Sequence, residues 1–251
     1  MKREALVVYG GWEFHEPEKV ANIFKDFLEE SGFKVMLSDT LDIYSDKERL
    51  KSLDLIVPNW TTGKLSVEQL DGILEAVASG VGLAGCHAGL CDAFRDSPDW
   101  QFMVGGQFVA HIGASGFGGN GIEFEVNIKE KGNPIVSGID DFRFYDEQYY
   151  LHVDPAVRIL AAAKIPPLEY RGADGKAGMH YLFGIGSWNL QEDAVLNGPH
   201  TKNGPAEVPV IWTKYWGRGR IFYNSLGHDA KRAGSQPSLT ITRRGFLWAS
   251  R

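Results

Sequence analysis

Cysteine is scarce in this sequence, which has only Cys86 and Cys91 among its 251 residues. Two thiols are too few for a disulfide framework, and four intervening residues are not the spacing of a zinc-knuckle pair. No run approaches the ~18 consecutive apolar residues of a membrane helix, and Met1 leads into a charged segment rather than an apolar leader. We therefore expect a cytoplasmic protein without a membrane partner.

An excess of positive charge is also lacking, because 26 Lys and Arg residues stand against 32 Asp and Glu residues, a net charge of −6. Nucleic-acid-binding proteins ordinarily carry a basic surplus, so no nucleic-acid partner is expected. The glycine-rich run 116–121 precedes a predicted strand instead of following one, which is the wrong context for a dinucleotide site. We predict no nucleotide cofactor and interpret 116–121 as a lid or turn.

Hydrophobic residues make up 43% of the chain, enough for a sizeable core. In the first half, apolar runs alternate with helical spacings. The predicted order is strand 5–9, a helix from Pro17 to Gly32, strand 33–37, strand 53–58, helix 66–78 and strand 81–84. Such βαβ units form a mostly parallel sheet, and we predict a single α/β domain over residues 1–251.

The second half has a different pattern, because apolar and charged residues alternate at 122–128 as in a half-exposed antiparallel strand. Further strands are predicted at 142–151, 157–162 and 179–183, with a hairpin at 208–214 and 220–224 and a last helix at 239–250. The stretch 184–209 is rich in Gly, Asn and Pro and is interpreted as a long excursion over the sheet. The second half thus predicts antiparallel additions to the sheet.

Histidines occupy the positions where α/β sheets bind ligands, beyond the carboxyl ends of strands. His15, His87 and His228 each follow a predicted strand, and Trp60 lies directly after the third one. His111 lies in a glycine-rich segment that begins at Gly105, which we interpret as a loop. The remaining histidines lack such a position and are interpreted as structural: His152, His180 and His200.

His87 lies between Gly85 and Gly89, a spacing that permits a sharp strand-to-helix turn with the central side chain above the sheet. Taken alone, this short motif is equally compatible with an ordinary glycine-rich turn. An imidazole at such a turn suits metal ligation or base catalysis. Cys86 is one place off centre, where we expect a small buried hydrophobe rather than a nucleophile.

Asp146 and Glu147 are adjacent carboxylates within the predicted strand 142–151. Neighbouring strand residues face opposite ways, so we expect only one of them in a pocket, and we select Glu147. Several histidines with one carboxylate and no usable thiolate describe either a site for a divalent metal such as Zn²⁺ or a metal-free acid/base cluster. In the metal case, the predicted ligands are His87 and His228.

A resemblance extends over nearly the whole chain. It rests on the motifs Gly85-x-His87-Ala88-Gly89, Gly105-Gly106-x-Phe108-x-x-His111, Asn133-Pro134-Ile135-x-x-Gly138-Ile139, Asp146-Glu147-x-Tyr149 and the run from Pro209 to His228. In these motifs the chain is similar to the trehalose-utilisation (ThuA-like) family. The resemblance implies a flavodoxin-like, class I glutamine-amidotransferase-like three-layer fold, and a role in catabolism of a disaccharide such as trehalose or of its 3-keto derivative.

In the related amidotransferases a cysteine occupies the position that His87 has here, so glutaminase chemistry is not expected. We predict instead that His87, Glu147 and His228 are catalytic. They would move the acidic proton beside a sugar carbonyl, which leads to isomerisation or elimination. The predicted carbohydrate-binding residues are His15, Trp60, His111 and Tyr149.

Two alternatives remain, because one fold hosts many functions. The first is a non-catalytic sugar- or metabolite-binding module on a degenerate amidotransferase fold. The second is a cysteine hydrolase, which requires Cys86 to be exposed. The enzyme hypothesis requires His87, Glu147 and His228 to converge. A homo-oligomer is compatible with this architecture.

Overall fold

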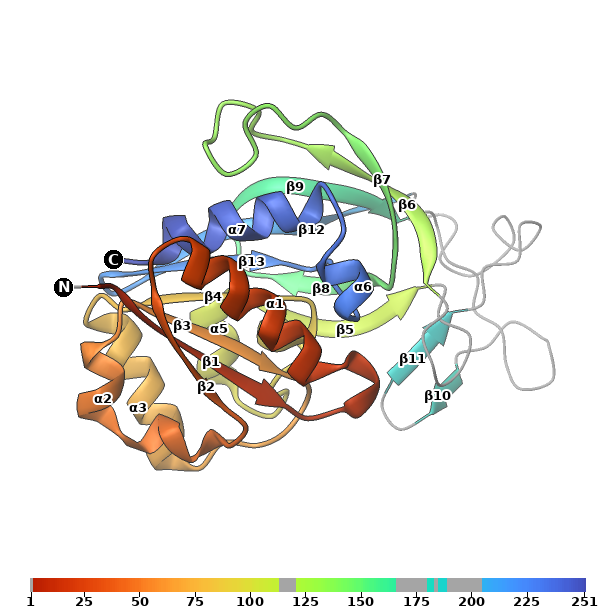
Figure 1. The fold of residues 1–251 in the computed structure, drawn as a ribbon. Helices are drawn as coiled ribbons and strands as arrows, with labels where there is room; N and C mark the ends of the chain where they lie inside the picture. Colours follow the sequence, from red (N-terminus) through yellow and green to blue (C-terminus); the bar gives the residue numbers. More distant parts are fainter. Residues whose placement is uncertain (1, 113–120, 166–179, 183–184, 189–204) are drawn as a thin grey trace.

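The computed structural model describes residues 2–112, 121–165, 180–182, 185–188 and 205–251 (Figure 1). Within these ranges the strands form two sheets, one of nine strands in the order β2-β1-β3-β4-β13-β12-β9-β6-β7 and one of four in the order β10-β11-β5-β8. The elements follow one another as β1 (Glu4–Gly10), η1 (Glu13–His15), α1 (Pro17–Glu30), β2 (Lys34–Ser38), η2 (Leu41–Ser45), α2 (Lys47–Ser52), β3 (Leu55–Trp60), α3 (Val67–Ala78), β4 (Gly82–Cys86), α4 (Ala88–Cys91), α5 (Pro98–Val104), β5 (Gly106–Ile112), β6 (Ile122–Ile128), β7 (Phe142–Asp146), β8 (Gln148–Val153), β9 (Arg158–Ile165), β10 (His180–Leu182), β11 (Ile185–Trp188), β12 (Ala206–Trp216), β13 (Gly219–Asn224), α6 (Ala230–Ala233) and α7 (Ser238–Ala249).

The large sheet has a parallel half and an antiparallel half. Strands β2, β1, β3, β4 and β13 run parallel to one another. Strands β12, β9, β6 and β7 extend the sheet in antiparallel pairs. The predicted α/β fold, with a parallel sheet and antiparallel additions from the second half of the chain, is confirmed.

Helices cover both faces of the parallel half (Figure 1). Successive strand residues face opposite sides of the sheet, and because both sides of these strands are apolar, both need to be covered. On β1, Ala5 belongs to a buried cluster with Phe24 of α1 and Phe246 of α7. Leu6 belongs to a second cluster with Ile73 of α3. Helix α3 begins at a capping box in which the Ser66 hydroxyl and the Gln69 side chain satisfy each other's backbone N–H groups. The three layers therefore follow from continuous apolar strands whose side chains pack in turn against the helices on each face.

The predicted single strand 142–151 is wrong. The chain forms β7 and β8, which belong to different sheets, and Glu147 lies between them. The Asp146 carboxylate accepts the N–H of Glu147 at 2.9 Å, so a side chain replaces a ladder partner at this point. Because the strand is interrupted here, Asp146 and Glu147 are both buried, contrary to the expected alternation.

The predicted loop around His111 is also wrong, because residues 106–112 form strand β5, paired with β8. Gly105 has φ +84° and ends α5, but Gly106 is a strand residue. A Cβ on Gly106 would lie 2.8 Å from the Trp212 ring and 2.9 Å from Cys91 Sγ. Gly105 therefore marks the end of a helix, and Gly106 allows close packing in a strand. In the sequence, two adjacent glycines look like a loop.

Two predicted segments lie largely outside the described residues. Residues 113–120 contain most of the predicted lid or turn, and residues 189–204 contain most of the predicted excursion. The short helices α2, α5 and α6 were not expected from the sequence, whereas the last hairpin and the last helix lie where they were predicted. None of the described helices is long and apolar enough to span a membrane.

Candidate functional site

Three histidines from distant segments meet at one edge of the large sheet, where the parallel strands β1, β4 and β13 end. His15 ends η1 after β1, His87 follows β4, and His228 follows β13. The ring centroids of His15 and His228 lie 4.6 Å apart, and each lies 5.2–5.4 Å from that of His87. All three are buried. The carboxyl ends of parallel strands lie at the same edge of a sheet, so the topology itself brings the imidazoles together.

The predicted sharp turn between β4 and α4 is present, and it is made at His87, with φ 48° and ψ −122°. A non-glycine residue in this region stores roughly 1–3 kcal/mol of strain, which the surroundings must hold. The His87 N–H donates to the Asn224 carbonyl at 2.7 Å, and the His87 carbonyl accepts from the Tyr223 hydroxyl at 2.7 Å. Strand β13 therefore fixes the strained backbone.

Gly85 and Gly89 serve close packing, because the positive φ belongs to His87 itself. A Cβ on Gly89 would collide with the Pro58 carbonyl oxygen. A Cβ on Gly85 would lie 2.8 Å from Leu90 Cγ. The two glycines thus let α4 lie directly against β3.

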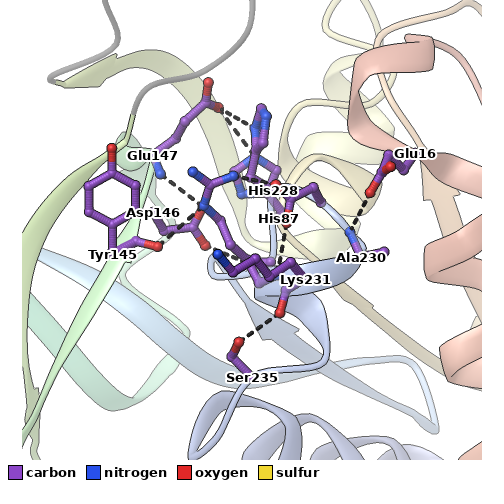
Figure 2. Close-up of polar contacts among 12 residues, drawn as sticks. Glu16, His87, Tyr145, Asp146, Glu147, His228, Ala230, Lys231 and Ser235 are labelled. Atoms are coloured by element: carbon purple, nitrogen blue, oxygen red, sulfur yellow. Dashed lines mark hydrogen bonds and ion pairs between the residues drawn. The ribbon is translucent and has the colours of Figure 1, made fainter.

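Glu147 reaches two of the imidazoles with one oxygen (Figure 2). Its Oε2 lies 3.3 Å from His87 Nε2 and 3.1 Å from His228 Nδ1. His87 Nδ1 donates to the Ser225 carbonyl at 3.0 Å. Because a carbonyl only accepts, Nε2 carries the lone pair of neutral His87 and faces Glu147. His15 Nδ1 is hydrogen-bonded to Thr61 Oγ1 at 2.7 Å, which orients the third ring.

The buried histidine group is electrostatically suited to positive charge. Burial by itself lowers the pKa of His87, but Glu147, the charge of Asp146 and the Ser225 carbonyl outweigh it, so the pKa lies above its usual value. Burial raises the pKa of Asp146, against the attraction of His87 and the N–H groups of Gly227 and Glu147. A proton or a cation among the imidazoles is therefore stabilised.

The residues fit a divalent metal ion. One ligand atom from each of His15, His87, Glu147 and His228 lies within 4.8 Å of the others. His87 Nε2 and His228 Nδ1 are buried and make no hydrogen bond among the described residues, although each lies close to Glu147. Buried polar atoms in this state are costly unless a proton or cation satisfies them. Imidazole nitrogen and carboxylate oxygen are donors that Zn²⁺ and similar ions prefer.

The other predicted site residues divide into two groups. The Tyr149 ring lies 4.3 Å from that of His87. The Trp60 ring packs against Gly10 and Gly63 at the end of β3, where any Cβ would collide with it. His111 is opposite Tyr149 in the ladder of β5 and β8. The structure therefore gathers His15, His87, Tyr149, Glu147 and His228, whereas the Trp60 ring contacts the end of β1 and the segment after β3.

Some residues of the site were not selected from the sequence. Thr61 and Ser225 orient two imidazoles. The Trp12 ring, which the sequence offers with Trp60 and Tyr149 as a stacking surface for a sugar, lies 4.7 Å from His15 and 6.4 Å from His228. Buried Asp92 pairs with Arg95 at 2.5 Å, and burial raises the pKa of Asp92 to about 6 against the pull of that guanidinium. The one available signal was position, because Thr61 directly follows a strand and Ser225 lies within the last motif.

Cys86 does not meet the requirement of the hydrolase hypothesis. Its side chain is buried, and burial raises the pKa of the thiol to about 12. A nucleophilic cysteine needs an accessible thiolate. Both cysteines are free thiols.

Comparison with known families decides the relationship of this chain. The family model described as trehalose utilisation, ThuA, matches residues 4–249. The chain belongs to the ThuA family. The resemblance seen in the sequence motifs is therefore confirmed, and the family description implies a role related to trehalose utilisation. No curated protein matches this ThuA-family chain in sequence.

Solved structures show the same fold. A protein described as ThuA-like from Parabacteroides merdae has a TM-score of 0.67 at 19% identity, over 99% of this chain and 90% of the other. A second one, from Bacteroides uniformis, has a TM-score of 0.69 at 17% identity, over 98% and 91%. A protein from Salmonella typhimurium described as cytoplasmic has a TM-score of 0.56 at 11% identity, over the full length of both chains. At these identities, the likeness shows the fold alone.

Proposed function

We propose that this ThuA-family chain is an enzyme of carbohydrate catabolism that acts on a disaccharide or its 3-keto derivative by acid/base chemistry. The observation that carries the proposal is the buried group of three imidazoles and one carboxylate, brought together from four separate segments. A buried polar group of this kind lowers the stability of the fold unless a ligand or a proton binds to it. Such destabilising groups are concentrated at functional sites.

A divalent metal such as Zn²⁺ would be held by His15, His87, Glu147 and His228, and when bound it would polarise a substrate carbonyl. The protein side chains supply proton transfer. A carbonyl at the third carbon of a sugar makes the neighbouring C–H protons acidic. Glu147 would accept such a proton through the carboxylate oxygen that does not bind the ion, or His228 would accept it where that residue is not a ligand. In the metal-free form His87, whose pKa is raised, would hold a proton near the developing oxyanion.

Removal of that proton gives an enediolate form of the sugar, which can react further in two ways. Reprotonation at the adjacent carbon gives an isomer. Alternatively, the C–O bond to the glycosidic oxygen breaks in a β-elimination, and that oxygen takes the proton back from the base and leaves as a hydroxyl group of the second sugar. Tyr149 and His15 line the site of this chemistry, and we assign them to substrate binding together with Trp12, Trp60 and His111.

The test is solvent-proton exchange in a 3-keto glucoside, followed by NMR in D₂O with protein loaded with Zn²⁺, Mn²⁺ or Co²⁺. We expect loss of the signal from the proton beside the carbonyl at a rate proportional to protein concentration, and loss of this activity in Glu147→Gln. Metal content is measured on the same samples. Absence of exchange with every metal, in protein that binds the sugar, would contradict the enolisation mechanism.

One observation favours the second candidate, a non-catalytic sugar- or metabolite-binding module. Three histidines and one glutamate supply four ligand atoms, and a tetrahedral ion bound by all four has no open position for substrate. The visible spectrum of the Co²⁺-loaded protein distinguishes the two, because a closed tetrahedral site would not respond to added sugar. An enzyme site would change its spectrum as the sugar binds.

We further propose that the protein works in the cytoplasm on a small carbohydrate, without a nucleic-acid or membrane partner. The two free thiols favour a reducing compartment. The net charge of −6 does not favour binding to phosphate backbones. A homo-oligomer remains part of the proposal, and light scattering of the purified protein tests it.

A further inference from the structure

Asp146 lies behind the histidine group, with its side chain at 0% exposure (Figure 2). Its Oδ2 accepts the N–H of Gly227 at 2.6 Å, and its Oδ1 accepts the N–H of Glu147 at 2.9 Å. Gly227 immediately precedes His228. One carboxylate therefore joins the backbone beside His228 to the backbone of Glu147, although these segments are far apart in the sequence.

We propose that Asp146 is the positioning residue of the site, whose carboxylate holds Glu147 and His228 at the spacing that a shared cation requires. The inference rests on the proposed metal-assisted function and adds a residue that the chemistry itself does not use. It explains why two carboxylates stand next to each other at the junction of β7 and β8, since one presents an oxygen to the imidazoles and the other fixes the backbone.

The hydrogen bonds require an acid at this position. Both partners of Asp146 are N–H donors, so the side chain must offer two acceptor oxygens. Asparagine offers one oxygen and one NH₂ group, and the NH₂ group would face an N–H. Asp146→Asn thus breaks one of the two connections whichever way the amide is turned, and leaves a buried donor unsatisfied.

The same carboxylate also lies near the helix that follows His228. Arg232 Nε of α6 lies 3.7 Å from Asp146 Oδ1, and Arg232 also pairs with Asp229. Asp146 is therefore connected to the chain before His228 and to the helix after it. A residue with contacts on both sides of a ligand restricts the movement of that ligand.

The experiment measures binding of Zn²⁺ and Co²⁺ to metal-stripped full-length protein, by competition with a chelator. We expect Asp146→Asn to weaken binding about 10–100-fold, as the loss of partners behind metal ligands typically does, and to change the visible Co²⁺ spectrum. The spectrum reports ligand geometry, which a general loss of stability in a folded protein would leave unchanged.

Asp54→Asn is the matched control. Asp54 Oδ2 accepts the N–H of Glu4 at 2.7 Å, and Arg251 Nε lies 3.7 Å from Asp54 Oδ1, so this carboxylate also joins a backbone N–H to an arginine, although its side chain is 24% exposed and holds one N–H where Asp146 holds two. Asp54 precedes β3 and thus lies at the opposite edge of the sheet from the histidines. We expect its metal affinity and Co²⁺ spectrum to equal those of the wild type.

Unchanged affinity and spectrum in folded Asp146→Asn would overturn the proposal. If Asp146→Asn does not fold, hydrogen exchange of the metal-free wild type tests the proposal instead. The Gly227 and Glu147 amides must then exchange slowly, and exchange as fast as that of exposed loops would overturn the proposal.

If the wild type binds neither metal, the proposed metal site is wrong, independently of the role of Asp146. The positioning role is then judged by the exchange of these two amides, which must be faster in Asp146→Asn.

Discussion

At the scale of single residues, the site depends on one oxygen that two imidazoles share. His87 Nε2 and His228 Nδ1 both face Glu147 Oε2, at 3.3 and 3.1 Å. Because the Ser225 carbonyl fixes the proton of His87 on Nδ1, the neutral ring presents a lone pair to a carboxylate. This contact is repulsive unless a second proton or a cation lies between the two groups. The negative charge of Glu147 therefore favours a proton or a cation at this position.

Replacement of Glu147 by Gln tests this assignment. The amide keeps the size of the side chain but removes the negative charge, so we expect metal affinity to fall by at least about 100-fold. Solvent-proton exchange of the 3-keto glucoside should fall below detection. Isothermal titration with Zn²⁺ and the NMR assay measure the two effects.

Glu123→Gln on β6 is the control, since this carboxylate is exposed and pairs with Arg143. It should leave metal affinity and exchange unchanged. Equal metal affinity in Glu147→Gln and the wild type would remove Glu147 from the ligand set.

The buried thiol of Cys86 gives a prediction with a defined pH dependence. With its pKa raised to about 12, only ~10⁻⁴ of the thiol is ionised at pH 8, against about a quarter for an ordinary cysteine of pKa ~8.5. Iodoacetamide should therefore react at least ~10³-fold more slowly in the native protein than after unfolding. The rate should rise about tenfold per pH unit up to pH 11, as measured by mass spectrometry. Rapid native alkylation that abolishes activity would restore the cysteine hydrolase hypothesis.

The sequence identifies residues by type and position more readily than by their partners. His15, His87 and His228 could be selected because each follows a strand, and Glu147 because a carboxylate interrupts an apolar segment. Thr61, Ser225 and Asp146 act through hydrogen bonds to residues distant in the sequence. No local pattern records such partners, and for Asp146 the assumption of an unbroken strand led to the wrong expectation.

At the scale of elements, the turn between β4 and α4 depends on contact with β3. Gly89→Ala should destabilise the protein by about 2 kcal/mol or more, because the new methyl group would collide with the Pro58 backbone and overpacking of this kind costs about 1–3 kcal/mol. Urea unfolding measures the loss. Gly132→Ala, in open space, should change the free energy of unfolding by less than about 0.5 kcal/mol. Equal stability of the two variants would show that α4 does not need its close approach.

The loop between β1 and α1 carries an aromatic pair beside the site. The Trp12 and Phe14 rings lie 5.3 Å apart, Trp12 adjoins His15 and His228, and Phe14 is 51% exposed. A sugar can place its apolar face on such a ring, and we expect this contact to be worth as much as one between two aromatic rings, about 0.5–1.5 kcal/mol. We therefore expect Phe14→Ala to weaken binding of a disaccharide about 2–12-fold and that of a monosaccharide less, as measured by titration calorimetry.

Tyr215→Ala is the control for this loop, because Tyr215 is 63% exposed and its ring neighbour is Trp248, on a different part of the surface. It should leave both affinities unchanged. A Phe14→Ala protein that binds disaccharide as tightly as the wild type would contradict the role of the aromatic pair.

Element prediction succeeded where local pattern and tertiary role agree. The parallel strands and the helices α1 and α3 are recognisable because their apolar residues follow the period of each element. The division of 142–151 into β7 and β8 was not recognisable, because apolar residues on both sides of Asp146, Glu147 and Gln148 read as one strand, and only the contacts of Asp146 explain the break. Strand β5 was missed because Gly105 and Gly106 resemble a loop until their packing against Trp212 is known.

At the scale of the whole molecule, the strand order explains why the site can form. Strand β13 lies beside β4 and parallel to it, so the end of β13 brings His228 next to His87. The general rule that ligands bind at the carboxyl ends of parallel strands predicted which edge to examine. The placement of the small sheet, whose strand β8 begins directly after Glu147, follows from long-range pairing and was not predictable from periodicity.

Because the ligand set joins β1, β4, β13 and the junction of β7 and β8, metal binding should stabilise the entire fold. An ion at 100 times its dissociation constant contributes about 2.7 kcal/mol to a folded state that alone binds it. For a chain of this size each kcal/mol raises Tm by about 2–4 °C, so Zn²⁺ should raise Tm by about 5–10 °C relative to protein with chelator. Differential scanning calorimetry measures the shift, and Glu147→Gln should show almost none of it. An equal shift in that variant would mean that the ion binds elsewhere, and the four segments would then be connected by their packing and not by a metal.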